Sequence, residues 1–144
     1  MDPKEFLTTA DRLIRGQPSE GDLRSAMSRS YYSCYHAIRI ELKRQFTLAL
    51  LQQSGLGGKI IDHSKLCMAL KACKTTYDLG IDLDNLKRLR HLADYDLSTV
   101  VTPTDATKTV DDARDFHQDL DAAGGTAAVV RMLHADLQSV HGNI

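Results

Sequence analysis

The chain has 144 residues, enough for one domain with its own hydrophobic core and too few for two ordinary domains. Apolar residues make up 42% and charged residues 26%, which is a globular composition and excludes a wholly disordered chain. The formal net charge of −1 excludes the strongly basic profile of a dedicated duplex-DNA binder, although it is compatible with a local basic patch.

Cysteine usage and the first residues indicate the compartment. Cys34, Cys67 and Cys73 are odd in number and form no Cys-x-x-Cys pair, which favours buried thiols in a reducing compartment over a disulfide framework or a zinc site. The N-terminus is charged where a signal peptide would be apolar, and no stretch approaches the length of a membrane span. We therefore expect a cytoplasmic protein outside the membrane, with no metal and no cofactor.

Apolar residues recur at helical spacing almost throughout the chain. The spacing predicts a first helix that ends near Gly16, and a second that runs from about Leu23 to about Gln53 without an internal proline or glycine. At 1.5 Å per residue the second helix would be about 45 Å long, which is long for a small domain. A break before Phe46 would contradict this prediction.

The rest of the chain is also expected to be helical. Asp62 is a plausible cap for a third helix, and a fourth is expected from about Asp82 to about Ser98. The segment 102–105, Thr-Pro-Thr-Asp, predicts the start of a fifth helix that continues to about Ala123. The reason is that threonine can cap, proline has no N–H to lose there, and aspartate faces the helix's positive end.

The expected fold class is all-α, an antiparallel up-and-down bundle of four to five helices, one of them long. We divide the chain into a bundle, residues 1–123, and a C-terminal amphipathic helix, residues 124–144, that could pack on the bundle or on a partner. Its apolar stripe exceeds what a five-helix monomer needs, so we expect self-association; the competing interpretation folds the stripe onto its own bundle. The stripe consists of Val129, Val130, Leu133, Leu137 and Val140.

The first informative segment, residues 29–37, reads Arg-Ser-Tyr-Tyr-Ser-Cys-Tyr-His-Ala. Helical spacing places Arg29, Tyr32 and His36 on one stripe of the long helix. Three tyrosines within five residues put hydroxyl groups beside the core, where each needs a hydrogen-bond partner or an opening to water.

The second informative segment, residues 88–96, reads Arg-Leu-Arg-His-Leu-Ala-Asp-Tyr-Asp. Arg90 and Asp94 are four residues apart and can pair along the helix. An unpaired charge in the seam between two helices would be costly, so we also expect Arg29 to approach Asp94 within ion-pairing or water-bridged distance, with Tyr32 or Tyr95 alongside.

The two segments together resemble the HEPN family. The run from Ser28 to Ala37 is similar to the Arg-x-Tyr-Tyr-x-x-x-His-Ala signature of HEPN proteins. The run from Arg90 to Asp96 is similar to the Arg-x-x-Ala-Asp-Tyr-Asp motif of one bacterial and archaeal branch. His63 and the helix after segment 102–105 fall in the family's order, and the resemblance covers about residues 5 to 122.

The resemblance implies a helical bundle, commonly a homodimer, that acts on RNA. Many HEPN proteins are metal-independent endoribonucleases of toxin–antitoxin, CRISPR and phage-defence systems, often paired with a nucleotidyltransferase. Their catalytic motif is an arginine, four to six residues, then a histidine, in a late helix, and cleavage leaves a 2′,3′-cyclic phosphate. No histidine stands at that spacing after Arg88 or Arg90; the one formal match, Arg29 to His36, lies in the earlier helix.

We therefore take His36, Arg29 and Arg90 as candidate catalytic residues, because a histidine titrates near neutral pH and an arginine can hold a phosphate bidentately. The expected site-lining residues are Tyr32, Arg88, Asp94 and Tyr95. The predicted function is RNA binding or processing, in a toxin–antitoxin or defence system, with a degenerate catalytic motif. Two alternatives stay open: a catalytically silent HEPN module that binds a nucleotide or a nucleotidyltransferase partner, and a purely structural bundle.

Overall fold

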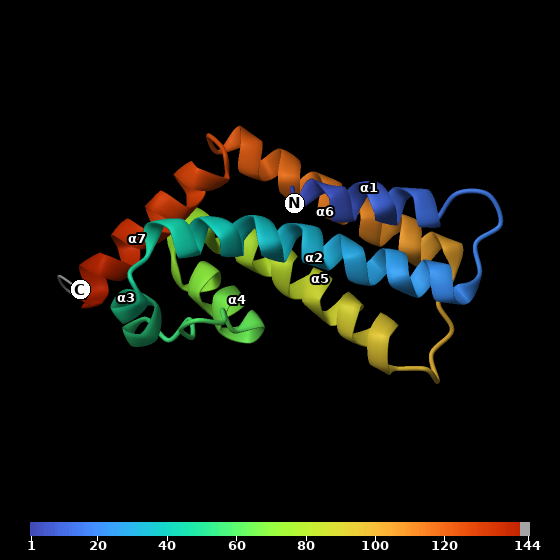
Figure 1. Ribbon diagram of the computed structural model, residues 1–144, viewed down its shortest axis with the longest axis horizontal. Coiled ribbons are helices and arrows are strands. Elements are labelled where there is room, and N and C mark those ends of the chain that lie inside the picture. Colours follow the sequence, from blue (N-terminus) through green and yellow to red (C-terminus); the bar gives the residue numbers. More distant parts are fainter. Residues whose placement is uncertain (142–144) are drawn as a thin grey trace.

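The computed structural model describes residues 1–141, and their regular secondary structure is helical, as predicted (Figure 1). Among them, no helix is both long enough and apolar enough to cross a membrane. In chain order the helices are α1 (Lys4–Leu13), α2 (Glu20–Gln45), α3 (Leu48–Gln53), α4 (His63–Ala72), the 3-10 turn η1 (Lys74–Thr76), α5 (Tyr77–Tyr95), α6 (Pro103–Ala122) and α7 (Thr126–His141).

Helix α2 runs through the middle of the bundle and packs against α1, α5, α6 and α7 (Figure 1). A capping box starts it: Ser19 Oγ accepts the backbone N–H of Asp22 at 3.1 Å, and the Asp22 carboxylate accepts the N–H of Ser19 at 3.0 Å. Its buried residues, which include Tyr31, Ile38 and Leu42, form the centre of the main hydrophobic core.

The predicted end of this helix at Gln53 is wrong, because α2 ends at Gln45. Phe46 adopts an extended conformation, and Thr47 Oγ1 accepts the N–H of Leu50 at 3.1 Å to cap the separate helix α3. The turn brings Phe46 and Leu50 back into the core, where their side chains are 6% and 0% exposed. Burial of these side chains in the main core stabilises the turn.

The predicted boundaries of the fourth helix also shift, since α5 begins at Tyr77, before Asp82. Its C-terminal end is held by Arg24 from α2, whose guanidinium donates to the carbonyl oxygens of Leu92 and Ala93 at 3.2 and 3.0 Å. A helix end leaves such carbonyls without intrahelical partners, so an arginine side chain from another helix fills the role usually taken by a C-terminal glycine.

The C-terminal stripe packs on its own bundle. Val129, Val130, Leu133 and Leu137 of α7 are buried in the main core, whereas Val140 is 76% exposed. Those four buried side chains are therefore not free to form an interface between copies, so this stripe gives no support to self-association. The homodimer stays a prediction.

Helices α4 and α5 approach each other most closely at Gly80. A Cβ atom added there would lie 2.7 Å from the backbone nitrogen of Lys71 and 2.9 Å from Leu70 Cβ, both in α4. Only glycine fits this contact without a backbone shift, because carbon atoms normally stay about 3.5 Å apart or more.

Replacing Gly80 with alanine should therefore destabilise the protein. Overpacking typically costs about 1–3 kcal/mol, against a gain of at most about 1 kcal/mol from helix propensity. Gly21→Ala is the matched control, because a Cβ at Gly21 would meet only Ser19 Oγ at 3.7 Å. Urea denaturation should show a lower free energy of unfolding for Gly80→Ala and an equal or higher one for Gly21→Ala. Stabilisation by both variants would contradict the close α4–α5 contact.

Candidate functional site

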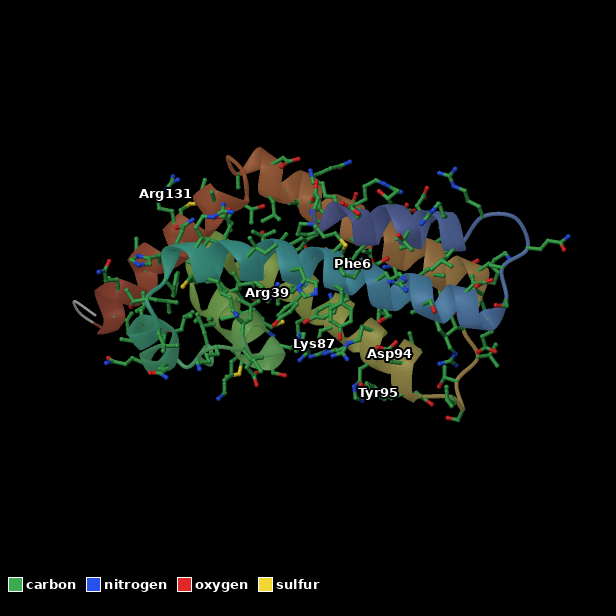
Figure 2. The ribbon with its side chains drawn as sticks, viewed as in Figure 1. Phe6, Arg39, Lys87, Asp94, Tyr95 and Arg131 are labelled. Carbon is green, nitrogen blue, oxygen red and sulfur yellow. The ribbon has the colours of Figure 1, made fainter. Side chains whose placement is uncertain are left out.

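Rings from three helices gather on one side of α2, and we call this group the ring cluster. Neighbouring ring centroids lie between 4.1 and 6.5 Å apart. Figure 2 labels Phe6 of this group, together with Arg39 of α2 and Lys87 of α5. The ring cluster consists of Phe6 from α1, Tyr31, Tyr32, Tyr35 and His36 from α2, and His63 from α4.

His63 is held against α2 by two tyrosines. Its ring stacks on Tyr35 at 4.1 Å, and its Nδ1 atom hydrogen bonds with the Tyr31 hydroxyl. The Tyr35 hydroxyl donates to the carbonyl oxygen of Ile61 at 2.7 Å. Asp62 accepts the N–H of Lys65 at 2.9 Å and so begins α4 at His63. The two buried hydroxyl groups thus fix the segment that carries the histidine.

The His36 ring packs against the rings of Phe6 and Tyr32, with centroid distances of 5.3 and 5.6 Å. Its Nδ1 atom accepts a hydrogen bond of 3.0 Å from Arg39 Nε. Because a guanidinium can only donate, the neutral His36 ring must carry its proton on Nε2. His63 differs, because the Tyr31 hydroxyl can donate to Nδ1 or accept from it, which leaves Nε2 of His63 free to accept a proton.

Both histidines are neutral at pH 7. Burial lowers the pKa of His36, and the nearby charges of Arg39 and His63 lower it further. Burial also lowers the pKa of His63, as do Arg90 and Lys87, against a smaller opposing effect of Asp62. Neither Nε2 atom hydrogen bonds to a described residue, and neither is fully buried, so each can reach a molecule outside the protein.

Arg90 lies over the ring cluster with its hydrogen-bonding capacity unused. The guanidinium carbon is 5.5 Å from the Tyr31 ring centroid and 5.7 Å from that of Tyr32, and the side chain is only 13% exposed. Within residues 1–141 it makes no hydrogen bond, its Nε is buried without a partner, and its one carboxylate neighbour, Asp94, stands 3.9 Å away. The two Nη atoms are not buried, so an oxyanion can reach them from outside the protein and bind them.

The predicted ion pair between Arg29 and Asp94 is not formed. Arg29 is exposed and makes no ion pair within 4.0 Å in the part of the chain that the structure describes. Asp94 instead accepts a hydrogen bond of 3.1 Å from Ser28 Oγ. The reason is geometric, since successive residues of a helix point about 100° apart and the one that faces α5 here is Ser28.

The two remaining sequence candidates on α5 point away from the histidines. Arg88 forms an ion pair of 3.0 Å with Asp84. Tyr95 is 64% exposed and contacts the ring of His91, at 4.9 Å. Figure 2 shows Asp94 and Tyr95 farther along α5, toward its C-terminal end. The structure therefore brings together His36, Tyr32 and Arg90, but not Arg29, Arg88 or Tyr95.

Lys87 adds a further positive charge beside His63. Its ammonium group lies 3.3 Å from the Asp84 carboxylate and 3.1 Å from Ser64 Oγ, in the first turn of α4. Burial raises the pKa of Asp84, but the hydrogen bonds from Lys71 and Lys87 have a larger combined effect in the other direction. The pKa of Asp84 therefore lies below its usual value. Asp84 stays ionised and so holds Lys87 in place.

Sequence reasoning did not single out His63 or Arg39 as site residues, although His63 fitted the order of the resemblance. Arg39 could have been found from its i, i+3 spacing to His36. No sequence signal shows that His63 faces α2, because that contact depends on the packing of α4. The chain matches no protein-family model, no curated protein and no solved structure, so the candidate site rests on its own geometry.

Removal of the Arg39 charge should raise the pKa of His36. Arg39 stabilises the neutral ring both by its charge and by its hydrogen bond to Nδ1, so Arg39→Met removes two effects that lower the pKa. Arg44→Met is the control, because Arg44 is an exposed residue of the same helix that pairs with Glu41. An NMR titration of the histidine ring protons measures both variants. An unchanged His36 pKa in Arg39→Met would contradict the contact.

Proposed function

We propose that the protein binds RNA over the ring cluster and cleaves it without a metal ion. The observation that carries the proposal is Arg90, a largely buried guanidinium without a hydrogen bond to any described residue, placed beside two histidines whose Nε2 atoms are accessible. A phosphodiester supplies the oxygens that such a guanidinium binds bidentately. Lys87 and Arg39 add positive charge around the same position.

The hydrogen bonds of the two histidines give them different roles. His63 Nε2 takes the proton from the ribose 2′-hydroxyl, whose oxygen attacks the adjacent phosphorus. The bond from phosphorus to the 5′-oxygen breaks, and protonated His36 gives its Nε2 proton to that oxygen. The products are a 2′,3′-cyclic phosphate and a 5′-hydroxyl, and Arg90 stabilises the charge on the non-bridging oxygens.

The ring cluster suits RNA in its single-stranded form. Phe6 and Tyr32 are half-buried and lie next to His36, so both side chains are partly accessible from outside. Unpaired bases stack on aromatic side chains of this kind, typically for about 1–3 kcal/mol each. A duplex would hide its base faces, so single-stranded RNA is the better substrate.

The resemblance to HEPN proteins supports the same proposal. In HEPN ribonucleases the arginine and histidine come from one late helix, whereas here Arg90 stands on α5 and the histidines on α2 and α4. A place in a toxin–antitoxin or defence system, with a homodimer or a nucleotidyltransferase partner, is part of the proposal. The alternative is a silent module that uses Arg90 to bind a nucleotide phosphate.

The test is cleavage of a single-stranded RNA oligonucleotide by the purified protein, with and without EDTA. His36→Ala and His63→Ala should each lower the rate by roughly two to four orders of magnitude, the usual worth of a positioned acid or base. Arg90→Lys should also lower it, because lysine cannot bind bidentately. Arg29→Ala is the matched control, since Arg29 is an exposed arginine of α2 outside the ring cluster.

Each alternative gives a different result in the same experiment. RNA binding that needs Arg90 but gives no cleavage would favour the silent module. The structural bundle would show neither binding nor cleavage, together with lower thermal stability of His36→Ala. A cleavage rate that is lower in Arg29→Ala and unchanged in Arg90→Lys would mean that the phosphate does not bind at Arg90, and would contradict its assignment.

The pH dependence of cleavage should be bell-shaped, with its maximum on the acid side of neutrality. The reaction needs His63 neutral and His36 protonated, and the pKa values of both are lowered from 6.5. As the pH rises above the pKa of His36 the acid form disappears, and as it falls below the pKa of His63 the base becomes protonated. Arg39→Met should move the alkaline limb to higher pH. A rate that keeps rising above pH 8 would exclude His36 as the acid.

A further inference from the structure

A concave surface lies on the opposite flank of α4, away from the ring cluster. It has a volume of about 750 Å³ and is bordered by the end of α3, by α4 and by α7. We call it the α4–α7 groove. None of its lining residues belongs to the ring cluster. Its apolar lining residues include Met68, Ala69, Ala72, Leu137 and Val140.

The groove exposes more apolar surface than a helix face normally would. Met68 is 66% exposed on α4, and Val140 faces it across the groove from α7 with a similar exposure. Cys73 also lines the groove: burial raises the pKa of its thiol, and the carboxylate of Asp136 raises it further, so the thiol stays protonated. An apolar groove with a polar rim is typical of a ligand site.

The charges of the groove are unequal at its two ends. Lys65 lies in the first turn of α4, whereas Lys74 lies in η1, beyond the C-terminal end of α4. Near Lys74 stands a carboxylate, because Asp136 hydrogen bonds with Thr75 at 3.5 Å. Lys65 makes no ion pair within 4.0 Å in residues 1–141; Asp62, in the same turn, accepts only its backbone N–H. The Lys65 end is therefore the more positive one.

We propose that the α4–α7 groove binds a small amphipathic anion, an aliphatic chain with one carboxylate head. The chain lies along Ala69, Ala72 and Leu137, and the head contacts Lys65, at the end of the groove where no carboxylate of a described residue belongs to the lining. The volume of about 750 Å³ lies within the roughly 300–1,000 Å³ that is usual for a small-molecule site.

The test uses decanoate as the probe, with decanol and decylamine as probes of equal chain length and different charge. Isothermal titration calorimetry should show decanoate binding more tightly than decanol, and decylamine not binding. Lys65→Glu should weaken decanoate binding at least tenfold. Lys74→Glu should weaken it less, because Asp136 already opposes that charge. Lys59→Glu is the control, an exposed lysine outside the groove with the same change of charge.

Two results would overturn the proposal. Equal binding of decanoate and decanol, unchanged in Lys65→Glu, would mean that the groove is only an apolar surface. Light scattering that shows a dimer dissociated by Met68→Asp, together with no decanoate binding by wild type, would mean that a second copy of the chain covers it. Met68 is exposed, so Met68→Asp should fold, and circular dichroism checks this. RNA cleavage by Lys65→Glu should be unchanged, which keeps this test separate from that of the ring cluster.

Discussion

Helix α2 packs against α1, α5, α6 and α7, so its polar side chains must find their hydrogen-bond partners inside the bundle. Ser30 and Ser33 do so within their own helix, by donating to the carbonyl oxygens of Ala26 and Ser30 at 2.8 Å. Tyr31 and Tyr35 cannot, because their hydroxyl groups lie at the ends of long, rigid side chains. They bond instead to His63 and to the carbonyl of Ile61. The hydrogen bonds that these two tyrosine hydroxyl groups need therefore fix the start of α4 and bring His63 to the candidate site.

Arg90, unlike the serines and tyrosines of α2, has a buried polar atom without a hydrogen-bond partner among the described residues. Its contacts with the faces of Tyr31 and Tyr32 are worth about 0.5–2 kcal/mol, which does not replace the hydrogen bonds that a guanidinium makes in water. A helix designed only for stability would place an apolar side chain there. Local rules are most often broken at functional positions, where affinity for a ligand takes priority over stability. For this reason Arg90, and not the better-paired Arg88, marks the site.

The sequence was most informative where the determinants are local. Asp62 and Thr102 cap helices as predicted, because a cap depends on a residue and its next three neighbours. Thr47 does the same and was missed, since the apolar spacing continues through it and no glycine or proline marks the turn. The orientation of side chains between helices was the least predictable feature. The prediction was wrong by one residue about which side chain of α2 faces α5, so it named Arg29 as the partner of Asp94 where the structure has Ser28. The contact between His63 and α2 depends on how the whole of α4 packs.

The position of the tyrosines gives the protein an internal optical probe. The chain contains five tyrosines and no tryptophan, and Tyr31, Tyr32 and Tyr35 all belong to the ring cluster. Near-ultraviolet absorption and emission therefore come largely from the rings that surround the histidines, without the stronger tryptophan signal that usually hides them. A molecule that displaces water from Tyr32, the partly exposed ring of the three, changes the spectrum of the unlabelled protein. Occupancy of the site can thus be followed in real time without attaching a dye.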